Sequence, residues 1–518
     1  MSAGRLLSGW GSKFAAVARA LAGPFTASRR KARHRELVEF ALPYRENPGM
    51  FATAAGVFML RRIARRWRGF RLAGAFPLPP GDAAAPAAAS REAGGGSRDG
   101  EYDVLVVGGG PAGSTAATLL ARGGLSVALI ERERFPRFHV GESLLPANLP
   151  LFERLGVLDR IVAHGFIPKY GASFHDQESG IEHTFYFREG KPWPHYSFEV
   201  QRAEFDRILL EHAAGQPGVE LFQPVAVERV SFDPEGVTAR LAGGGREFRA
   251  RFLVDASGRD GFLASRFGSR RAIPGLGKVA IFAHFRGARR WPGRDEGNIR
   301  IYIFDGGWFW WIPFAGDVTS VGCVLHARTA RGREGSLPEL FDAMIARCDR
   351  VREGLGAAER VTPVHTAANF SYRVEPLVGD RFLCIGDAAT FVDPIFSSGV
   401  LVAMQSAELA SAAILDAFRA NRFEAARFAG YRRRLRKGLG PFIHFIRQYY
   451  DPAFLEIFLR PRETAGMLDS VTGVLAGGAV LSMPLRMRLS LALFSTIVRL
   501  HRWRRSRDGR SVESRLEW

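Results

Sequence analysis

Asp103–Glu131 reads DVLVVGGGPAGSTAATLLARGGLSVALIE, and this stretch decides the fold. The apolar run Asp103–Val107 is typical of a parallel strand that is buried on both faces. The small residues of Ser114–Ala121 begin a helix, and Ser126–Glu131 forms the next strand. A strand, a glycine turn, a helix and a second strand make a βαβ unit. The sequence therefore predicts an α/β protein that opens with a Rossmann-type dinucleotide-binding domain.

The glycine turn after the first strand has the spacing of a phosphate-binding loop. Gly108, Gly110 and Gly113 form the pattern G-x-G-x-x-G, which lets the backbone approach a pyrophosphate and the helix pack closely on the strand. The helix N-terminus adds N–H donors and partial positive charge. Glu131 ends the second strand, where its carboxylate can hold ribose hydroxyls. The predicted cofactor-binding residues of this unit are Gly108, Gly110, Ala112, Gly113, Ser114 and Glu131.

Three further segments resemble the flavoprotein monooxygenase superfamily. Arg381–Ala389 (RFLCIGDAA) resembles its second FAD fingerprint, which implies that Asp387 accepts hydrogen bonds from ribityl hydroxyls. Leu253–Gly258 (LVDASG) resembles the turn beside the adenosine half, and Val200–Asp206 (VQRAEFD) resembles the helix start that carries Arg202 near the cofactor. Together they predict FAD. No second G-x-G-x-x-G lies in a βαβ context, so we expect a partner flavin reductase to supply FADH2.

Trp308–Pro313 reads WFWWIP, with three tryptophans in four residues. On a strand, Trp308, Trp310 and Ile312 face one side and the two residues between them face the other. The segment therefore predicts a rigid aromatic wall with bulk on both faces. The alternative interpretation is an ordinary buried core strand, since Trp and Ile favour strands.

This hexapeptide and several other segments resemble the flavin-dependent halogenases, over a span from about residue 102 to residue 502. WFWWIP matches the family's W-x-W-x-I-P signature at every fixed position. The other segments are Phe135–Pro146 (FPRFHVGESLLP), Asp393–Val400 (DPIFSSGV), Tyr449–Phe454 (YYDPAF) and Val474–Gly477 (VLAG). The resemblance implies an α/β fold with a GxGxxG FAD-binding domain, an inserted mixed β-sheet substrate domain and a helical C-terminal region.

The resemblance also implies a reaction, of the kind found in secondary metabolite and antibiotic biosynthesis. FADH2, O2 and chloride or bromide yield hypohalous acid, which reaches a lysine in a separate chamber and there halogenates an electron-rich aromatic ring. Lys169, in the segment GFIPKYGA, is the candidate for that lysine. A buried amine among apolar groups has its charged form disfavoured, which suits a donor or a nucleophile.

The remaining site residues separate substrate from flavin and bind the halide. Ser398 and Gly399 would offer backbone N–H groups to a halide. The alternative for Ser398 is a helix N-cap, and the two roles are compatible. The predicted barrier between flavin and substrate consists of Trp308, Trp310, Ile312 and Pro313.

Phe396 bears on the substrate. In the free-tryptophan branch of the family a glutamate stands at this position, and Phe396 cannot act as a base. This departure favours phenols or pyrroles, which are often tethered to an acyl or peptidyl carrier protein. His139, Glu142, His175 and Asp176 lie nearby in sequence, without an assigned role.

The net charge of +20 is concentrated at the chain ends. Residues 1–75 hold fifteen Lys or Arg against three acids, and residues 486–510 hold eight Arg against one Asp. Basic ends favour an anionic surface, which suggests peripheral contact with the inner face of a membrane, although solvated charge explains them equally well. No nucleic-acid module accompanies them, so we expect no specific nucleic acid partner. The uncharged stretches Gly49–Leu60 and Val471–Leu485 are too short to span a bilayer.

The three cysteines are far apart, which predicts neither a metal site nor a disulfide framework and favours the cytoplasm. The predicted divisions are a basic N-terminal extension (1–76) with an interfacial helix near 50–72, a flexible linker (77–100), an FAD-binding domain (101–405) whose β-sheet substrate subdomain covers about 166–200 and 275–360, and a helical C-terminal region (406–518) with a basic tail.

Two alternatives to a halogenase stay open on the sequence. An FAD-dependent aromatic hydroxylase or a prenyl-lipid reductase shares the Gly108 turn and the Asp387 segment but lacks the tryptophan signature. A lipid reductase would explain the basic, apolar ends better. A membrane-associated flavin-binding protein with decayed activity is the second alternative, and the intact Lys169, Ser398 and aromatic wall argue against it.

Overall fold

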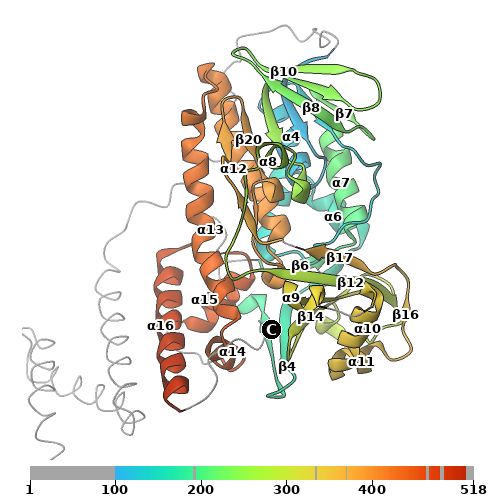
Figure 1. Cartoon of the computed structure of the whole chain (residues 1–518), viewed down its shortest axis with the longest axis vertical. Helices are drawn as coiled ribbons and strands as arrows, with labels where there is room; N and C mark the ends of the chain where they lie inside the picture. Colours follow the sequence, from blue (N-terminus) through green and yellow to red (C-terminus); the bar gives the residue numbers. More distant parts are fainter. Residues whose placement is uncertain are drawn as a thin grey trace, which may run out of the picture. The chain divides into compact units, whose positions relative to one another are not determined.

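The computed structural model describes residues 100–190, 194–332, 335–368, 370–461, 466–478 and 483–508 (Figure 1). These described residues belong to one compact unit. The predicted extension (1–76), its interfacial helix near 50–72, all but the last residue of the linker (77–100) and the end of the basic tail lie outside the described residues. The predicted domain boundaries stay predictions.

The first sheet is the predicted nucleotide-binding sheet. Its central strands are parallel in the order β20-β10-β1-β2-β7, and β1 connects through α4 to β2 as the βαβ pattern predicts. Antiparallel β19 adds to one edge, and the β8–β9 pair adds to β10. The bounds are β1 Glu101–Val107, α4 Pro111–Arg122, β2 Val127–Ile130, β7 Val219–Phe222, β8 Val227–Phe232, β9 Val237–Leu241, β10 Glu247–Asp255, β19 Val378–Gly379 and β20 Phe382–Cys384.

The second sheet is the predicted mixed sheet. Its strands run in the order β16-β12-β15-β14-β13-β4-β5, with β17 also on β12, and only β13 and β4 pair in parallel. Helices α9 to α11 follow β15 in the chain. The bounds are β4 Gly171–Asp176, β5 Ile181–Tyr186, β12 Lys278–Arg286, β13 Ile299–Phe304, β14 Gly307–Pro313, β15 Val318–His326, α9 Ala327–Arg331, α10 Leu337–Arg347, α11 Asp349–Leu355, β16 Glu359–Arg360 and β17 His365–Ala368.

Smaller elements connect the two sheets. Among them, β3 and β6 pair as a two-stranded antiparallel ribbon, and β11, β18 and β21 form a three-stranded sheet. The bounds are α5 Leu149–Leu155, α6 Leu158–His164, β3 Ile167–Lys169, β6 Ser197–Glu199, α7 Arg202–Ala214, α8 Phe262–Phe267, β11 Arg270–Ala272, β18 Tyr372–Val374 and β21 Thr390–Phe391.

The C-terminal part is helical, as predicted. It consists of α12 Gly399–Ala420, α13 Ala429–Tyr449, α14 Pro452–Phe458, α15 Met467–Leu475 and α16 Leu485–Arg507. α12 is long and apolar enough to cross a membrane by length and composition, yet most of that stretch is buried in the protein and packs on α4. It is the core helix of the nucleotide-binding part, and it runs across the predicted boundary at residue 405.

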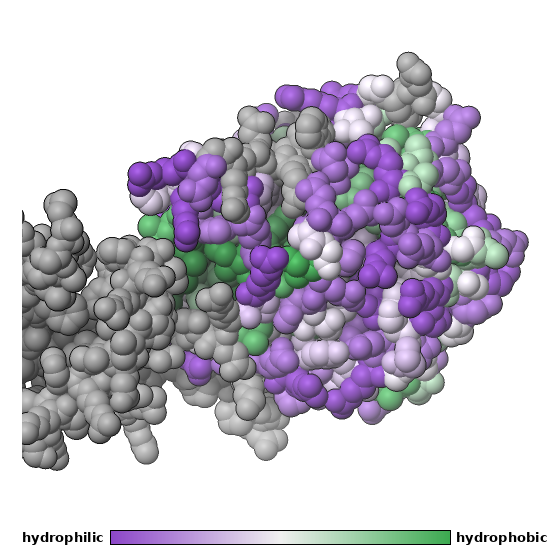
Figure 2. Space-filling view, turned by 90° about the horizontal axis from the view of Figure 1, so that it is seen from below, coloured by the Kyte–Doolittle hydropathy of each residue, from purple (hydrophilic) through white to green (hydrophobic). Residues whose placement is uncertain are grey.

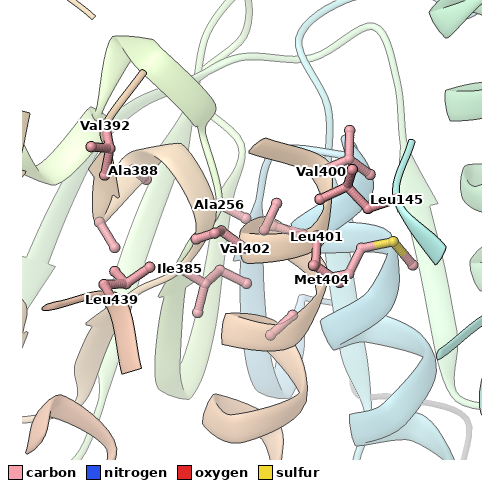
Figure 3. Close-up of a cluster of buried hydrophobic side chains, with 14 of the residues drawn as sticks. Leu145, Ala256, Ile385, Ala388, Val392, Val400, Leu401, Val402, Met404 and Leu439 are labelled. Atoms are coloured by element: carbon pink, nitrogen blue, oxygen red, sulfur yellow. The ribbon is translucent and has the colours of Figure 1, made fainter. Parts of the chain in front are cut away.

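Figure 3 shows the buried cluster at the start of α12. Val400, Leu401 and Met404 of α12 pack with Leu145 and Ile385 from other parts of the chain. Burial of such side chains stabilises the fold by about 1.5–3 kcal/mol each. The cluster therefore fixes the start of α12 against the glycine turn and the Asp387 segment.

β14 separates two cores, which confirms the alternation predicted for WFWWIP. Trp308, Trp310 and Ile312 belong to the larger hydrophobic core, and Phe309 and Trp311 belong to a second core built with α10 and α11. Every residue of β14 is buried. The interpretation as a buried core strand is thus also right, and the face that carries Trp308 has a further role described next.

Candidate functional site

A cavity of about 910 Å³ lies at the carboxyl ends of β1, β2 and β10, between the glycine turn and one face of β14. In doubly wound sheets, ligands bind at this position. We call it the flavin cavity. Its lining includes Gly108, Gly110, Ala112, Glu131, Arg202, Asp387, Trp308, Trp310, Ile312 and Gly399 from the predicted site residues, whereas Gly113, Ser114, Pro313, Ser398 and Lys169 are not part of the lining.

The glycine turn fits a dinucleotide phosphate group sterically. Gly108 has φ +106°, and a Cβ on it would lie 2.4 Å from the Ala256 carbonyl oxygen. A Cβ on Gly113 would lie 1.8 Å from the Gly108 oxygen, so neither position tolerates a side chain. α4 begins at Pro111 without a side-chain cap, which leaves backbone N–H groups of its first turn for phosphate oxygens.

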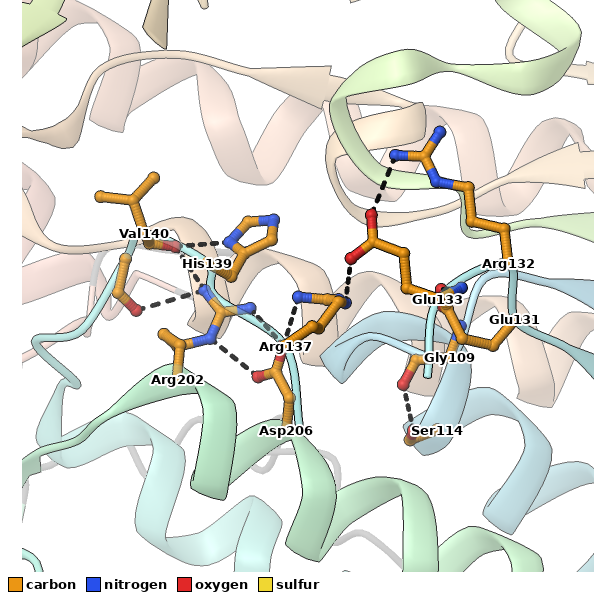
Figure 4. A network of polar contacts seen from close by, with 11 residues as sticks. Gly109, Ser114, Glu131, Arg132, Glu133, Arg137, His139, Val140, Arg202 and Asp206 are labelled. Carbon is orange, nitrogen blue, oxygen red and sulfur yellow. Dashed lines mark hydrogen bonds and ion pairs between the residues drawn. The ribbon is translucent and has the colours of Figure 1, made fainter. Parts of the chain in front are cut away.

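Glu131 and Ser114 hold this turn in shape (Figure 4). The Glu131 carboxylate accepts hydrogen bonds from the Gly109 N–H at 2.7 Å and the Glu133 N–H at 2.9 Å. The Ser114 hydroxyl donates to the Gly109 carbonyl at 2.8 Å. Glu131 also lines the flavin cavity, in a position that fits the predicted contact with ribose. Ser114 does not line the cavity and instead stabilises the turn through its hydrogen bond.

Arg202 and Asp387 lie on the same cavity wall. The Arg202 guanidinium donates to both oxygens of Asp206, at 2.7 and 2.9 Å, and to the Val140 carbonyl at 2.6 Å (Figure 4). Arg202 thus shapes the wall rather than extending freely into the cavity. Burial raises the pKa of Asp387 to about 6, and the positive charges of Arg202 and Arg259 oppose this rise. The Asp387 carboxyl lines the cavity, as an acceptor for sugar hydroxyls would.

Two hydrogen bonds anchor the aromatic wall, one to Ser320 of β15 and one to Tyr450 after α13. The Trp310 indole N–H donates to the Ser320 hydroxyl at 3.1 Å, and its ring occupies the space that a side chain at Gly322 would take. The Trp308 indole N–H donates to the Tyr450 hydroxyl at 3.4 Å, and Tyr450 donates to Asp393 at 2.8 Å. Three segments that carry the halogenase resemblance therefore meet in one chain of hydrogen bonds.

The Ser397–Gly399 turn joins Asp393 to α12. Ser397 has φ +54°, a left-handed conformation that costs a non-glycine residue roughly 1–2 kcal/mol. Ser398 follows with φ −87°, so the two residues form the left-handed then right-handed pair that makes a backbone anion nest. Ser398 stands at the N-cap position, but its side chain makes no capping bond. Ser397 and Gly399 line the flavin cavity.

Lys169 lies beyond the cavity wall at Ser143. It is 1% exposed, and its Nζ donates to the Ser143 hydroxyl at 2.7 Å and the Leu144 carbonyl at 3.2 Å. Ser143 itself lines the flavin cavity. Burial lowers the pKa of Lys169, and the negative charge of Glu199 opposes this. The amine is thus desolvated, as the sequence suggested, with one hydroxyl between it and the cavity.

Glu199 is a residue that the sequence analysis missed. It is fully buried, and its Oε1 lies 4.0 Å from the Lys169 Nζ. The β3–β6 pairing brings it there, because Lys169 pairs with Ser197 and Glu199 lies two residues further along the same face. We call Ser143, Lys169, Ser197 and Glu199 the lysine cluster. The sequence feature that could have indicated Glu199 is that Ser197 and Glu199 are polar and lie two residues apart in the otherwise apolar segment Ser197–Val200.

The residues without an assigned role fall in different places. Glu142 is buried, lines the flavin cavity like His139 and pairs with His284 at 2.7 Å. His139 lines the cavity, and burial with the charge of Arg202 lowers its pKa to about 4. His175 lies on β4, 3.9 Å from Glu182. Phe396 is buried against aromatic rings of α13 and is not part of the cavity lining.

The described part of the chain contains neither a metal-binding cluster nor a disulfide. No group of three or more His, Cys, Asp or Glu among the described residues is arranged to hold a metal ion. The three cysteines are all buried and unpaired with one another.

The fold, the glycine turn and the cavity define a flavoprotein, and residues 101–425 match the family model of the FAD binding domain. The chain belongs to the flavin-dependent halogenases. It is 36% identical over 422 residues to a 1H-pyrrole-2-carbonyl-[peptidyl-carrier protein] chlorinase of Pseudomonas fluorescens, which covers 76% of this chain and 94% of that protein. A tryptophan 2-halogenase of Chondromyces crocatus is 37% identical over 320 residues, 60% of each chain. The structure of the flavin-dependent brominase Bmp2 superposes with a TM-score of 0.68 at 30% identity, over 76% of this chain and 99% of that one.

Family membership confirms several expectations together. The chain is an FAD-dependent halogenase that uses halide and O2, and its fold is the predicted Rossmann-type FAD-binding fold with a mixed sheet. Family membership thus favours the halogenase over the hydroxylase, prenyl-lipid reductase and decayed-protein alternatives. The roles of individual residues are taken up as proposals.

Proposed function

We propose that this halogenase activates halide in the flavin cavity and transfers the halogen at Lys169 to an electron-rich phenol or pyrrole. The observation that carries this proposal is the buried Lys169 amine, which is separated from the cavity by the Ser143 hydroxyl. Hypohalous acid is small enough to pass a single side chain, whereas an aromatic ring is not. Substrate and flavin would therefore never meet.

The cavity residues divide the work of holding the cofactor. Backbone N–H groups of the Gly108–Gly113 turn would hold the pyrophosphate, Glu131 the ribose and Asp387 the ribityl chain. Bound as FADH2, the cofactor would reduce O2 by two electrons to the peroxide level, and the oxidant so formed would convert halide to hypohalous acid. The halide would bind at the backbone N–H groups of Ser398 and Gly399 next to the cavity, since the Ser397 N–H already donates to the Pro394 carbonyl at 3.0 Å.

The aromatic wall would exclude water and substrate from the cofactor. Trp308, Trp310 and Ile312 form a rigid apolar face of the cavity, and Pro313 ends the strand. Such a wall keeps the oxidant from reacting with other groups before it reaches Lys169. It also explains why the product is halogenated rather than hydroxylated.

The substrate is proposed to be a pyrrole or phenol, tethered to a peptidyl or acyl carrier protein. The chlorinase that matches most of this chain is named for a carrier-bound pyrrole. Phe396 cannot supply the carboxylate expected for a free tryptophan, although one relative over a shorter span is a tryptophan halogenase. We further propose a flavin reductase as electron donor, a cytoplasmic location, and peripheral membrane contact through the basic termini.

The replacement Lys169→Met tests the role of the lysine. We expect halogenation to fall by at least about a thousandfold, since a group that acts covalently or by proton transfer is lost. The assay uses full-length protein, FADH2, bromide and a panel of free and carrier-bound pyrroles and phenols, read by mass spectrometry. Lys437→Met, at an exposed lysine of α13, is the matched control. Halogenation at the wild-type rate by Lys169→Met would overturn the assignment.

The same variant should be more stable than the wild type. Because burial lowers the pKa of Lys169 below its ordinary value of 10.5, the protonated lysine destabilises the folded state. This penalty is complete below the folded pKa and fades as the pH rises through it toward 10.5. Lys169→Met should therefore raise the melting temperature at neutral pH, and the gain should shrink in alkaline buffer. A lower melting temperature at both pH values would argue against a desolvated amine.

A further inference from the structure

The carboxyl group of Glu199 is buried beside Lys169. Its Oε1 lies 4.0 Å from the Lys169 Nζ, and the Ser143 hydroxyl and the Ile299 backbone N–H are its other polar neighbours, although none of these contacts reaches strict hydrogen-bonding geometry. The Ser197 hydroxyl on the same face is buried and unpartnered as well. Buried polar atoms are nearly always well hydrogen-bonded, so a loosely bonded carboxyl and an unpartnered hydroxyl beside one amine indicate a site rather than a packing element.

We propose that Glu199 is the proton partner of Lys169 and positions its amine for halogen transfer. This inference rests on the proposed role of Lys169. The Glu199 carboxylate takes one proton from the Lys169 ammonium. The neutral nitrogen then bonds to the halogen of hypohalous acid while the oxygen–halogen bond breaks, and the leaving hydroxide takes an amine proton to become water. The aromatic carbon next takes the halogen, the nitrogen–halogen bond breaks, and the ring proton returns to nitrogen.

The surroundings favour this exchange. Burial raises the pKa of Glu199 to about 8, and the charge of Lys169 opposes the rise, while the pKa of Lys169 itself is lowered. The carboxyl and the amine thus bind a proton with more similar affinity than they would in water. Glu142 also acts on the Glu199 carboxyl, and it is paired with His284 on β12 at 2.7 Å. The ring of Phe187 covers the amine at 5.4 Å.

The test follows the Lys169 titration directly, in protein that is not turning over. The chain has six lysines, so ¹³Cε-lysine labelling gives a small set of NMR signals, and Lys169→Met assigns the one of interest. In Glu199→Gln we expect the Lys169 pKa to fall below its wild-type value, because the neighbouring negative charge is lost. We also expect halogenation to fall roughly a hundredfold with FAD affinity unchanged. Glu153→Gln, at an exposed residue of α5, is the matched control.

Two results would overturn the proposal. One is a Lys169 titration in Glu199→Gln that coincides with the wild type, and the other is wild-type halogenation at every pH. If Glu199→Gln does not bind FAD, Glu199→Asp carries the test, since it keeps the carboxyl group. If the Lys169 pKa in Glu199→Asp equals that of the exposed lysines, the proposal is contradicted. Loss of halogenation in Lys169→Met does not depend on these outcomes, so the two proposals fail separately.

A second inference concerns the outer face of α16, and it deepens the proposed membrane contact. Figure 1 shows α16 on the outer side of α14 and α15, on which it packs through Met487, Phe494 and Val498. Its opposite side carries an exposed apolar stripe. The stripe consists of Leu485, Leu489, Ala492, Leu500 and Trp503, whose spacing of three, four or eight residues places them on one helical face.

Arginines flank this stripe on both sides. Leu485, Leu489 and Trp503 are 64%, 54% and 60% exposed, and the helix has seven arginines and no acidic residue between residues 485 and 507. Most of the face seen in Figure 2 is hydrophilic, with a smaller hydrophobic area within it. Exposed apolar stripes of this kind are unusual on a monomeric surface and mark a contact.

We infer that α16 lies in the interface of an anionic phospholipid membrane. The stripe from residue 485 to residue 503 is about 27 Å long, so it fits a helix that lies flat with Leu and Trp among the acyl chains and Arg at the phosphates. A second copy of this chain would bring like charges together across the contact. The N-terminal segment 1–75 is equally basic, which disfavours it as the occupant.

The experiment is co-sedimentation of the full chain with phosphatidylcholine vesicles, with and without phosphatidylglycerol. The double variant Leu489→Glu/Trp503→Glu should lose roughly tenfold in binding to the anionic vesicles, and the wild type should bind neutral vesicles weakly. Val162→Glu, at an exposed apolar residue of α6, is the matched control and should bind like the wild type. FAD affinity and halogenation in solution verify the fold and test the proposed function independently.

Three outcomes would overturn the membrane assignment. Unchanged vesicle binding by the double variant would place the contact elsewhere. Equal binding to neutral and anionic vesicles would remove the role of the arginines. Loss of self-association, or of carrier-protein binding, without any change in vesicle binding would assign the stripe to a protein partner instead.

Discussion

The flavin cavity and the lysine cluster share Ser143, and they are built in opposite ways. The cavity is shaped by a backbone turn and by aromatic side chains, and its donors are N–H groups within a few residues of one another. The lysine cluster is closed, desolvated and assembled from segments more than twenty residues apart. Cofactor binding therefore depends on local geometry, whereas halogen transfer depends on the packing of distant segments. Variants can break one side and leave the other intact.

On the cavity side, the largest effect should come from Gly113→Ala. A Cβ at this position would lie 1.8 Å from the Gly108 oxygen, so the turn must open or the helix must move. We expect FAD affinity to fall by at least about a hundredfold, since the turn and helix N-terminus together hold the pyrophosphate. Flavin fluorescence during titration measures this. Gly430→Ala, a helical glycine with nothing within 4 Å of its Cβ, is the matched control and should bind FAD normally.

The lysine cluster should survive that change. In Gly113→Ala the Lys169 NMR signal should keep its wild-type titration, because the cluster is built from β3, β6 and the segment at Ser143 rather than from the turn. A shifted titration would show that the flavin cavity and the lysine cluster are coupled, which would contradict their independence.

The flavin cavity could be predicted from the sequence better than the lysine cluster, because local patterns determine the cavity and the pairing of distant segments determines the cluster. The glycine spacing, Glu131 and the alternation of β14 are periodic or local features, so they could be predicted and the fold with them. Lys169 was found through a motif, but its bond to Ser143 and the nearness of Glu199 depend on the pairing of β3 with β6. No local pattern fixes such a pairing. The conformation of Ser397, φ +54°, was also beyond reach, since serine rarely adopts it.

A moderate effect is expected from Gly322→Ala, which acts on the wall itself. The new Cβ would lie 2.1 Å from the Trp310 ring, which must shift and lose its bond to Ser320 at 3.1 Å. Overpacking of this kind costs about 1–3 kcal/mol of stability. We expect about a tenfold rise in O2 consumed per halogenated product, because a displaced wall admits water to the oxidant. Oxygen-electrode and mass-spectrometric measurements on the same sample give this ratio.

Gly332→Ala is the control for that variant, since its Cβ would meet only an ordinary contact at 3.5 Å. An unchanged ratio in Gly322→Ala, together with a lowered melting temperature, would mean that β14 serves only as a core strand. The wall would then have no part in separating the two sides.

The smallest effect should come from Ser143→Ala, at the boundary itself. The Ser143 hydroxyl accepts a hydrogen bond from the Lys169 Nζ at 2.7 Å, and the Leu144 carbonyl at 3.2 Å remains as an acceptor. Loss of the stronger of the two bonds should cost about 0.5–1.5 kcal/mol of unfolding free energy and lower the Lys169 pKa further, because the bond favours the charged amine. Urea denaturation measures the first and the NMR titration the second. Ser265→Ala, at an exposed serine bonded to the Asp260 carbonyl, should cost less than about 0.5 kcal/mol. Equal costs for the two alanine variants would mean that Ser143 belongs to the cavity wall alone, and that the lysine amine is held from the Glu199 side.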